Sequence, residues 1–192
     1  MFDIDFDRDI RWRFDCDYEY DYGAVGFRGR WAQGVAEAAA MHGPRLATLL
    51  GRELSAYCVG WQIGVDRGFP DSPVLLEFGG EQAEFMWSHF SCLSVTWNTV
   101  DPAVPPRHGF FRWIRDRCEP LDDLRGQYLW AVDLLEHPVP GHVAGVGLAF
   151  GRTYLAITDQ GEGNRLEFGP PASRYRQHRI ASMRPTAERV GR

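Results

Sequence analysis

The sequence predicts a mainly β protein with minor helices (α+β). Two related antiparallel β-meanders are expected to pack as a sandwich or barrel, beside an N-terminal strand region. Three observations support this fold class. Short apolar and β-branched runs are separated by Gly, Pro, Asp and Ser, which is typical of strands joined by turns. Several runs recur in order at an offset of 72 to 75 residues, and residues 2–22 alternate in polarity.

Residues 1–30 are predicted to form the N-terminal strand region. From residue 2 to residue 22 the odd positions are charged and the even positions are apolar or aromatic, except for Arg8. A period of two is typical of a strand with one buried face. One straight strand of this length would run about 69 Å at 3.3 Å per residue, which exceeds a domain of this size. The segment must therefore bend, break near Arg8 or extend beyond the body.

Helices are predicted in two places. Residues 31–50 have an apolar face that includes Trp31 and Leu46, with an alanine-rich centre that favours helix. Gly43-Pro44 interrupts this pattern, so that Pro44 can begin a second short turn. Residues 101–123 form a proline-rich linker, in which residues 110–114 suggest a short amphipathic helix.

Eight strands are predicted, four in each of two β repeats that span residues 51–100 and 124–169. The first four are expected at 54–61, 74–78, 83–87 and 93–97, and the second four at 128–135, 143–150, 154–157 and 165–168. Gly79-Gly80 is expected to form a hairpin turn. Residues 170–192 then form a basic tail.

Two motifs support an internal duplication. Leu-x-Gly-x-x-Leu-x-Ala occurs at 49–56 and 124–131, and Leu-x-Phe-Gly occurs at 76–79 and 148–151. A rival register exists, because Leu-Glu-Phe-Gly at 166–169 matches residues 76–79 completely. The alternative to duplication is two unrelated runs of hairpins, which share these residue types because hairpins need them. Recurrence of several elements in order favours duplication.

Composition limits the classes of protein that this chain can belong to. A length of 192 residues fits one domain or two small ones, and no run approaches the roughly 20 apolar residues of a membrane span. The N-terminus lacks the basic flank and apolar run of a secretory signal, so a cytoplasmic location is expected. Free and mostly buried cysteines are then expected, which are Cys16, Cys58, Cys92 and Cys118.

Every basic residue that carries a fixed charge is an arginine, because the chain contains no lysine. Schiff-base and PLP enzymes, P-loop phosphate binders and kinases all require a lysine amine. Arginine cannot replace it as a nucleophile, since the guanidinium stays protonated. A GC-rich genome is the simplest cause of the bias, and the exclusion of these classes holds whatever the cause.

Charge is unevenly distributed along the chain. Residues 1–22 carry eight acids against three arginines, whereas residues 174–192 carry six arginines against one acid, Glu188. The acidic, aromatic-rich chain suits a basic protein partner. The basic tail fits either contact with nucleic acid or a solvated terminus, and the acidic body disfavours a dedicated DNA binder. Association into an oligomer is compatible with the sequence.

No catalytic, cofactor-binding or metal-binding residue is predicted. His89-x-x-Cys92 has the spacing of half a metal site but lacks a second pair, and a turn between two strands is the favoured explanation. Glu77 and Glu167 could form an acid pair or could simply face solvent. Glycines 141, 145 and 147 precede a strand, whereas a dinucleotide loop must precede a helix. Asp3, Asp5, Asp7 and Asp9 resemble a calcium loop, but Arg8 occupies its required glycine position and Phe14 its closing position.

The sequence therefore predicts a non-enzymatic protein-binding module, one form of which would neutralise a basic toxin. Small acidic bacterial proteins that neutralise toxins share this composition, although no motif supports the analogy. The expected interaction residues are Asp3, Asp5, Asp7, Asp9, Trp12, Tyr18, Tyr20, Trp97 and Asp101.

Two alternatives stay open. A small-molecule-binding protein or hydrolase would have its cleft between the two repeats, with His89, Cys92, Glu77 and Glu167 as its first candidates. A subunit of a larger assembly would use the N-terminal strand to pair with the sheet edge of a neighbour.

Overall fold

The computed structural model describes residues 23–183, except 66, 89–91, 116–117, 139–140, 160, 162 and 171. The predicted strand at 2–22 and the end of the basic tail lie outside the described residues. The elements, in chain order, are β1 (Trp31–Gln33), α1 (Val35–Ala47), β2 (Leu54–Gln62), β3 (Val74–Phe78), β4 (Glu81–Ser88), β5 (Cys92–Trp97), β6 (Phe111–Arg115), α2 (Glu119–Asp122), β7 (Leu129–Glu136), β8 (Val143–Phe150), β9 (Thr153–Asp159), β10 (Asn164–Phe168) and β11 (Arg176–Ser182).

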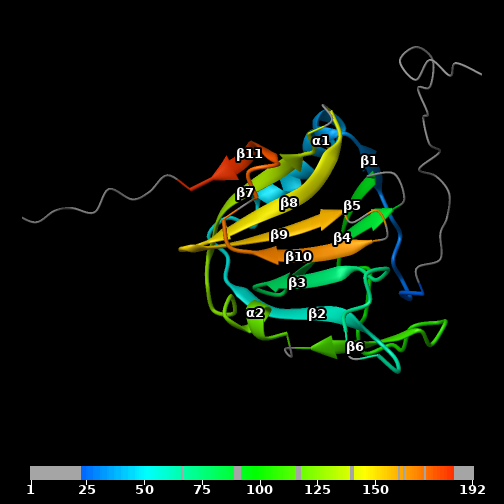
Figure 1. Ribbon diagram of the computed structural model, residues 1–192. Helices are drawn as coiled ribbons and strands as arrows, with labels where there is room; N and C mark the ends of the chain where they lie inside the picture. Colours follow the sequence, from blue (N-terminus) through cyan, green and yellow to red (C-terminus); the bar gives the residue numbers. More distant parts are fainter. Residues whose placement is uncertain are drawn as a thin grey trace, which may run out of the picture.

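Two antiparallel sheets make up the fold, which confirms the predicted mainly β class. The first sheet has the order β1-β5-β4-β3-β2-β6, and the second has the order β10-β9-β8-β7-β11. Strands β8 and β9 pack across β5 and β4, so the sheets lie face to face as a sandwich (Figure 1). Alternate side chains of both sheets meet in one core, which includes Phe85, Trp87, Leu134 and Ile157.

All eight predicted strands are present, and each agrees with its expected bounds to within two residues. Alternation made them recognisable, because every second side chain enters the core. Gly79 and Gly80 have positive φ angles of 58° and 87° and join β3 to β4, as expected for a two-residue hairpin turn.

The helical predictions need correction. Residues 31–33 form the short strand β1 beside β5, and α1 begins only at Val35. The helix then continues through Pro44 instead of breaking there. Burial explains this continuity, because Gly43 lies against Ile180 and Leu46 enters the core on the far side of the proline.

The predicted amphipathic helix at 110–114 is instead strand β6, which pairs with β2. Phe111 and Trp113 pack into a small cluster on the outer face of the first sheet, whereas Ile114 faces the main core. Part of the predicted basic tail is likewise a strand, since β11 pairs with β7. Each four-stranded meander therefore gains a fifth strand that returns to its first strand.

A reciprocal set of backbone hydrogen bonds joins the starts of β2 and β7. The Leu54 N–H donates to the Gln127 carbonyl and the Leu129 N–H donates to the Arg52 carbonyl, both at 2.9 Å. A second pair repeats this exchange, with Gly51 donating to Leu129 and Gly126 donating to Leu54. In both pairs the two donors are 75 residues apart in the chain, and so are the two acceptors.

The core contains a contact that corresponds to this exchange. Phe78 and Phe150, which end the two Leu-x-Phe motifs, stack with their centroids 6.2 Å apart and their planes 3° apart. The order of helix followed by five strands therefore occurs twice around an approximate two-fold axis. Duplication of an ancestral unit would explain this arrangement and remains a prediction.

Glu84 fixes the long connection that follows β5. Its side chain is buried on the outer face of the first sheet. Its carboxylate accepts hydrogen bonds from the Thr96 and Thr99 hydroxyls, from the Thr99 and Val100 N–H groups, and from the Gln82 amide. The buried charge is thus surrounded by donors, which offsets the loss of its water.

We expect Glu84→Gln to lower the free energy of unfolding by about 2–4 kcal/mol, because an amide places N–H donors against the surrounding donors. Urea denaturation followed by tryptophan fluorescence measures this loss. Glu77→Gln is the matched control on the neighbouring strand. Its exposed ion pair with Arg115 is expected to contribute less than about 1 kcal/mol. Equal losses for the two variants would contradict the assignment.

Candidate functional site

Most of the predicted interaction residues lie outside the described residues, namely Asp3, Asp5, Asp7, Asp9, Trp12, Tyr18 and Tyr20. The remaining two are occupied by local contacts. Trp97 is half-buried at the end of β5, and the Arg45 guanidinium lies 4.5 Å from the centre of its ring. Asp101 is exposed, and its carboxylate accepts the Ala103 N–H at 2.9 Å, which forms a turn.

Among the described residues, the candidates Glu77, Cys92 and Glu167 do not gather in one catalytic cleft. His89 lies outside the described residues, and Glu77 and Glu167 lie on different sheets. Cys92 is buried and disulfide-bonded, which corrects the expectation that it is free. Neither Cys58 nor Cys118 forms a disulfide, as predicted, and Cys16 lies outside the described residues.

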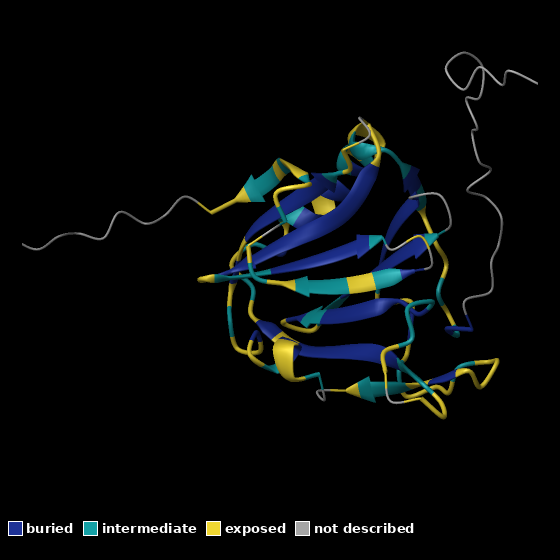
Figure 2. Ribbon diagram, viewed as in Figure 1, coloured by how far each residue is buried: buried dark blue, intermediate teal, exposed yellow. Residues whose placement is uncertain are grey.

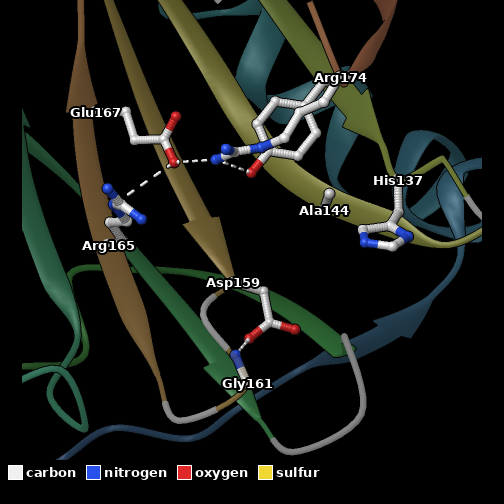
Figure 3. A pocket seen from close by; sticks show the side chains of 8 residues that line it. His137, Ala144, Asp159, Gly161, Arg165, Glu167 and Arg174 are labelled. Atoms are coloured by element: carbon white, nitrogen blue, oxygen red, sulfur yellow. Dashed lines mark hydrogen bonds and ion pairs between the residues drawn. The ribbon is translucent and has the colours of Figure 1, made fainter. Parts of the chain in front are cut away.

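A polar pocket of about 450 Å³ lies over β8, β9 and β10 (Figure 3). Its polar lining consists of His137, Asp159, Arg165, Glu167, Arg174 and Tyr175. The Glu167 carboxylate lies between the two arginines at one side of the pocket. Arg174 donates to the Glu167 carboxylate at 2.8 Å, and Arg165 approaches the same oxygen to 3.6 Å.

The contacts of Arg174 fix the connection that precedes β11. Its guanidinium donates to the Tyr175 hydroxyl at 2.8 Å and lies 4.6 Å from the centre of that ring. The Thr158 hydroxyl donates to Glu167 from the neighbouring strand. The charged groups of the polar pocket therefore bind one another and hold residues 174 and 175 against β10.

A buried carboxylate lies on the same face of the second sheet. Asp133 of β7 is inaccessible to solvent and pairs with Arg179 of β11. The Arg179 Nε and Nη2 groups donate to the two different carboxylate oxygens, and the Tyr154 hydroxyl donates to one of them at 3.2 Å. Trp130 covers the cluster, with its ring centre 5.7 Å from the guanidinium carbon. This cluster attaches the last strand to the sheet.

The pKa values of Tyr154 and Glu136, two residues of the second sheet, are shifted by their neighbours. Burial, together with the charge of Asp133, raises the pKa of Tyr154, so its hydroxyl remains a donor at neutral pH. The N–H of Gly141 and the side chain of His178 hold the pKa of Glu136 below its usual value. Glu136 therefore remains charged and joins the β7–β8 connection to β11.

Two glycines of β8 make room for these groups. A Cβ atom on Gly147 would lie 1.6 Å from the Tyr154 hydroxyl, and one on Gly145 would lie 2.9 Å from the Thr158 side chain. The glycine spacing that resembles a phosphate loop is therefore a packing requirement of a strand interior.

A group of exposed apolar side chains lies where β2 ends and β6 begins. We call it the apolar tip, and it consists of Ile63, Val65 and Phe110, whose exposed fractions are 55%, 47% and 64%. The Ile63 N–H donates to the Phe110 carbonyl, so the two loops that carry the tip are joined. A shallow groove of about 490 Å³ runs beside Ile63 and Val65 and is bordered by Arg112. Figure 2 shows these exposed loops at the lower right.

Sequence reasoning missed the two buried carboxylates, Glu84 and Asp133. Asp133 could have been found, because a single charge within the apolar run 129–135 is unusual. Glu84 could not, because an acid at alternate spacing on a strand normally faces solvent. The structure thus reveals two buried charges where the sequence suggested only strand surface and strand core.

No protein-family model, curated protein or solved structure matches this chain. Among the described residues, no group of His, Cys, Asp and Glu side chains is placed to hold a metal ion. Neither described helix is long and apolar enough to cross a membrane. The function of the chain must therefore be inferred from its own surfaces and cavities.

We expect Gly147→Ala to lower the free energy of unfolding by about 2–4 kcal/mol, because the added methyl group meets the Tyr154 ring below contact distance. Thermal and urea unfolding both measure the effect. Gly68→Ala is the matched control, since no atom lies within 4 Å of its added Cβ. An unchanged stability of Gly147→Ala would show that Tyr154 moves away without cost and that the Asp133 cluster is not rigid.

Proposed function

We propose that this chain is a non-enzymatic binding module for another protein and that the apolar tip is its contact surface. The observation that carries the proposal is the exposure of three large apolar side chains on two adjoining loops. Globular proteins expose large apolar side chains singly as a rule, and a cluster of them is typical of interaction sites.

Arg112 supports the proposal through its position and charge. It is exposed beside Ile63 and Val65 and makes no ion pair with another residue that the structure describes. Arginine and aromatic residues contribute most of the binding energy in many protein interfaces. A partner that presents apolar side chains flanked by a carboxylate would complement this surface.

The edge of the first sheet supports the same location. Strand β6 is the last strand of its sheet, and within the described part of the chain no strand pairs with its outer side. An extended segment of a partner could add to this edge while its side chains cover the tip. Both features lie on one side of the sandwich (Figure 1).

The expected basic partner rests on the acidic charge of the chain as a whole, to which residues 1–22 contribute eight acids. Charge complementarity to a basic protein, including toxin neutralisation, remains a prediction. A cytoplasmic location also remains a prediction. The disulfide at Cys92 weighs against it, because disulfides persist mainly in oxidising compartments.

The full-length protein tests the proposal by capture of a partner from native lysate, followed by surface plasmon resonance with the purified partner. Phe110→Asp is expected to weaken binding by about 30-fold or more, because it places a charge in the centre of the interface. Arg112→Gln is expected to slow association and to reduce its dependence on salt.

Tyr128→Asp is the matched control for this experiment. Tyr128 is 60% exposed but lies beside the start of β7, away from the apolar tip. Its substitution is expected to leave the affinity unchanged. The proposal fails if Phe110→Asp binds the partner as tightly as Tyr128→Asp does, or if no stoichiometric partner is recovered.

A further inference from the structure

A second cavity, which we call the seam pocket, lies between the two sheets at their open side. It has a volume of about 470 Å³, within the range of sites for small ligands. Both halves of the chain contribute to it. Val59, Trp61, Phe69 and Val74 come from the first half and Leu166 from β10, so its walls are mostly apolar.

Hydrogen bonds between the two halves of the chain fix one wall of the seam pocket. The Asn164 N–H donates to the Pro70 carbonyl at 2.9 Å, and the Asn164 amide donates to the Ser72 carbonyl at 2.6 Å. Ser72 is buried against Gly60, where a Cβ would lie 2.1 Å from its hydroxyl. Most of the wall is therefore held in place before a ligand enters, which lowers the entropy cost of binding.

One acceptor in this wall lacks a partner. The Oδ1 atom of Asn164 is buried and accepts no hydrogen bond from any residue that the structure describes. Its Nδ2 group, by contrast, donates to the Ser72 carbonyl and lies near the Phe85 carbonyl and the Met86 sulfur. A buried acceptor without a donor is unfavourable, and a ligand N–H or O–H group would satisfy it once a small shift of the neighbouring side chains uncovers the atom.

Two arginines border the seam pocket. Arg67 comes from the β2–β3 connection and donates to the neutral Gln62 side chain at 2.8 Å. Arg165 comes from β10 and is also 3.6 Å from the Glu167 carboxylate, so a ligand carboxylate would share it with Glu167. Guanidinium groups bind carboxylates through paired N–H donors. Because Arg165 also borders the polar pocket, a test must distinguish these two cavities.

We propose that the seam pocket binds an aromatic carboxylic acid that carries a ring N–H or O–H group. The ring lies between the apolar walls and beside Trp61 and Phe69, its N–H or O–H donates to Asn164 Oδ1, and its carboxylate binds Arg67 and Arg165. The seam pocket shares Trp61 with the groove beside the apolar tip, but its other lining residues differ, and the proposed ligand does not depend on the proposed protein partner.

Isothermal titration calorimetry of the full-length protein with indole-3-propionate and with 4-hydroxyphenylacetate tests this assignment. We expect a Kd on the order of 0.1–1 mM for at least one acid, given the small size of the probes. The primary amide of each acid is the matched probe, and it is expected to bind at least about fivefold more weakly because it lacks the charge. Absence of binding by both acids would overturn the proposal.

Variants distinguish the seam pocket from the polar pocket. Arg67→Gln changes an exposed side chain that borders only the seam pocket, and it is expected to weaken binding of the acid by about fivefold. Leu166→Trp fills the seam pocket and is expected to abolish binding. Arg174→Gln, which alters only the polar pocket, is expected to leave the affinity unchanged. An affinity that depends on Arg174 but not on Arg67 would place the ligand in the polar pocket and overturn the proposal.

Discussion

The exchange of backbone hydrogen bonds between the starts of β2 and β7 determines how the two sheets are related. Four N–H groups and their carbonyl acceptors hold residues 51–54 against residues 126–129. These backbone hydrogen bonds fix the register of the two segments. Strands β2 and β7, the first strand of each meander, therefore start from one fixed point. The meanders after this point must then face each other, and their apolar sides meet in a common core. The stacked Phe78 and Phe150 rings lie where this relation predicts equivalent residues to meet.

Buried carboxylates perform a similar task on the outer face of each sheet. Glu84 gathers the donors of the connection between β5 and β6, and Asp133 binds Arg179 of β11. In both cases a charge on a central strand attaches a segment that is distant in sequence. A carboxylate accepts several hydrogen bonds at once. Apolar contacts cannot hold these polar donors in place on the solvent-facing side of a sheet. The outer faces are therefore organised by ionic contacts, while the inner faces are organised by packing.

The strands could be predicted because alternation is a local property of the chain. Each of the eight strands in the two meanders has apolar residues at every second position, and turn residues separate consecutive strands. The fifth strands could not be predicted in this way. Phe111, Trp113 and Ile114 have apolar spacing that fits a short helix as well as a strand, and only pairing with β2 decides between them. Residues 176–182 are mostly polar, so their strand depends on ion pairs with β7.

The candidate sites were harder to predict than the fold, because they too depend on contacts between segments that are distant in sequence. The sequence suggested a cleft between the repeats, and a cavity does lie there. Its walls, however, include Asn164 and Arg67, which no motif singled out. The apolar tip combines residues 63 and 65 with residue 110, and their proximity results from the β2–β6 pairing. Sites built from loops that are distant in sequence leave no periodic pattern in either loop.

The return of the fifth strand has a consequence for synthesis on the ribosome. Val59 pairs with Ile114, and Asp133 pairs with Arg179, so each sheet is completed only near the end of its half. The first sheet can close while the second is still being translated, and its apolar inner face then has nothing to cover it. The nascent chain passes through an interval in which half of the future core faces water or a chaperone. Translation speed across residues 124–183 therefore sets how long that face remains open to aggregation.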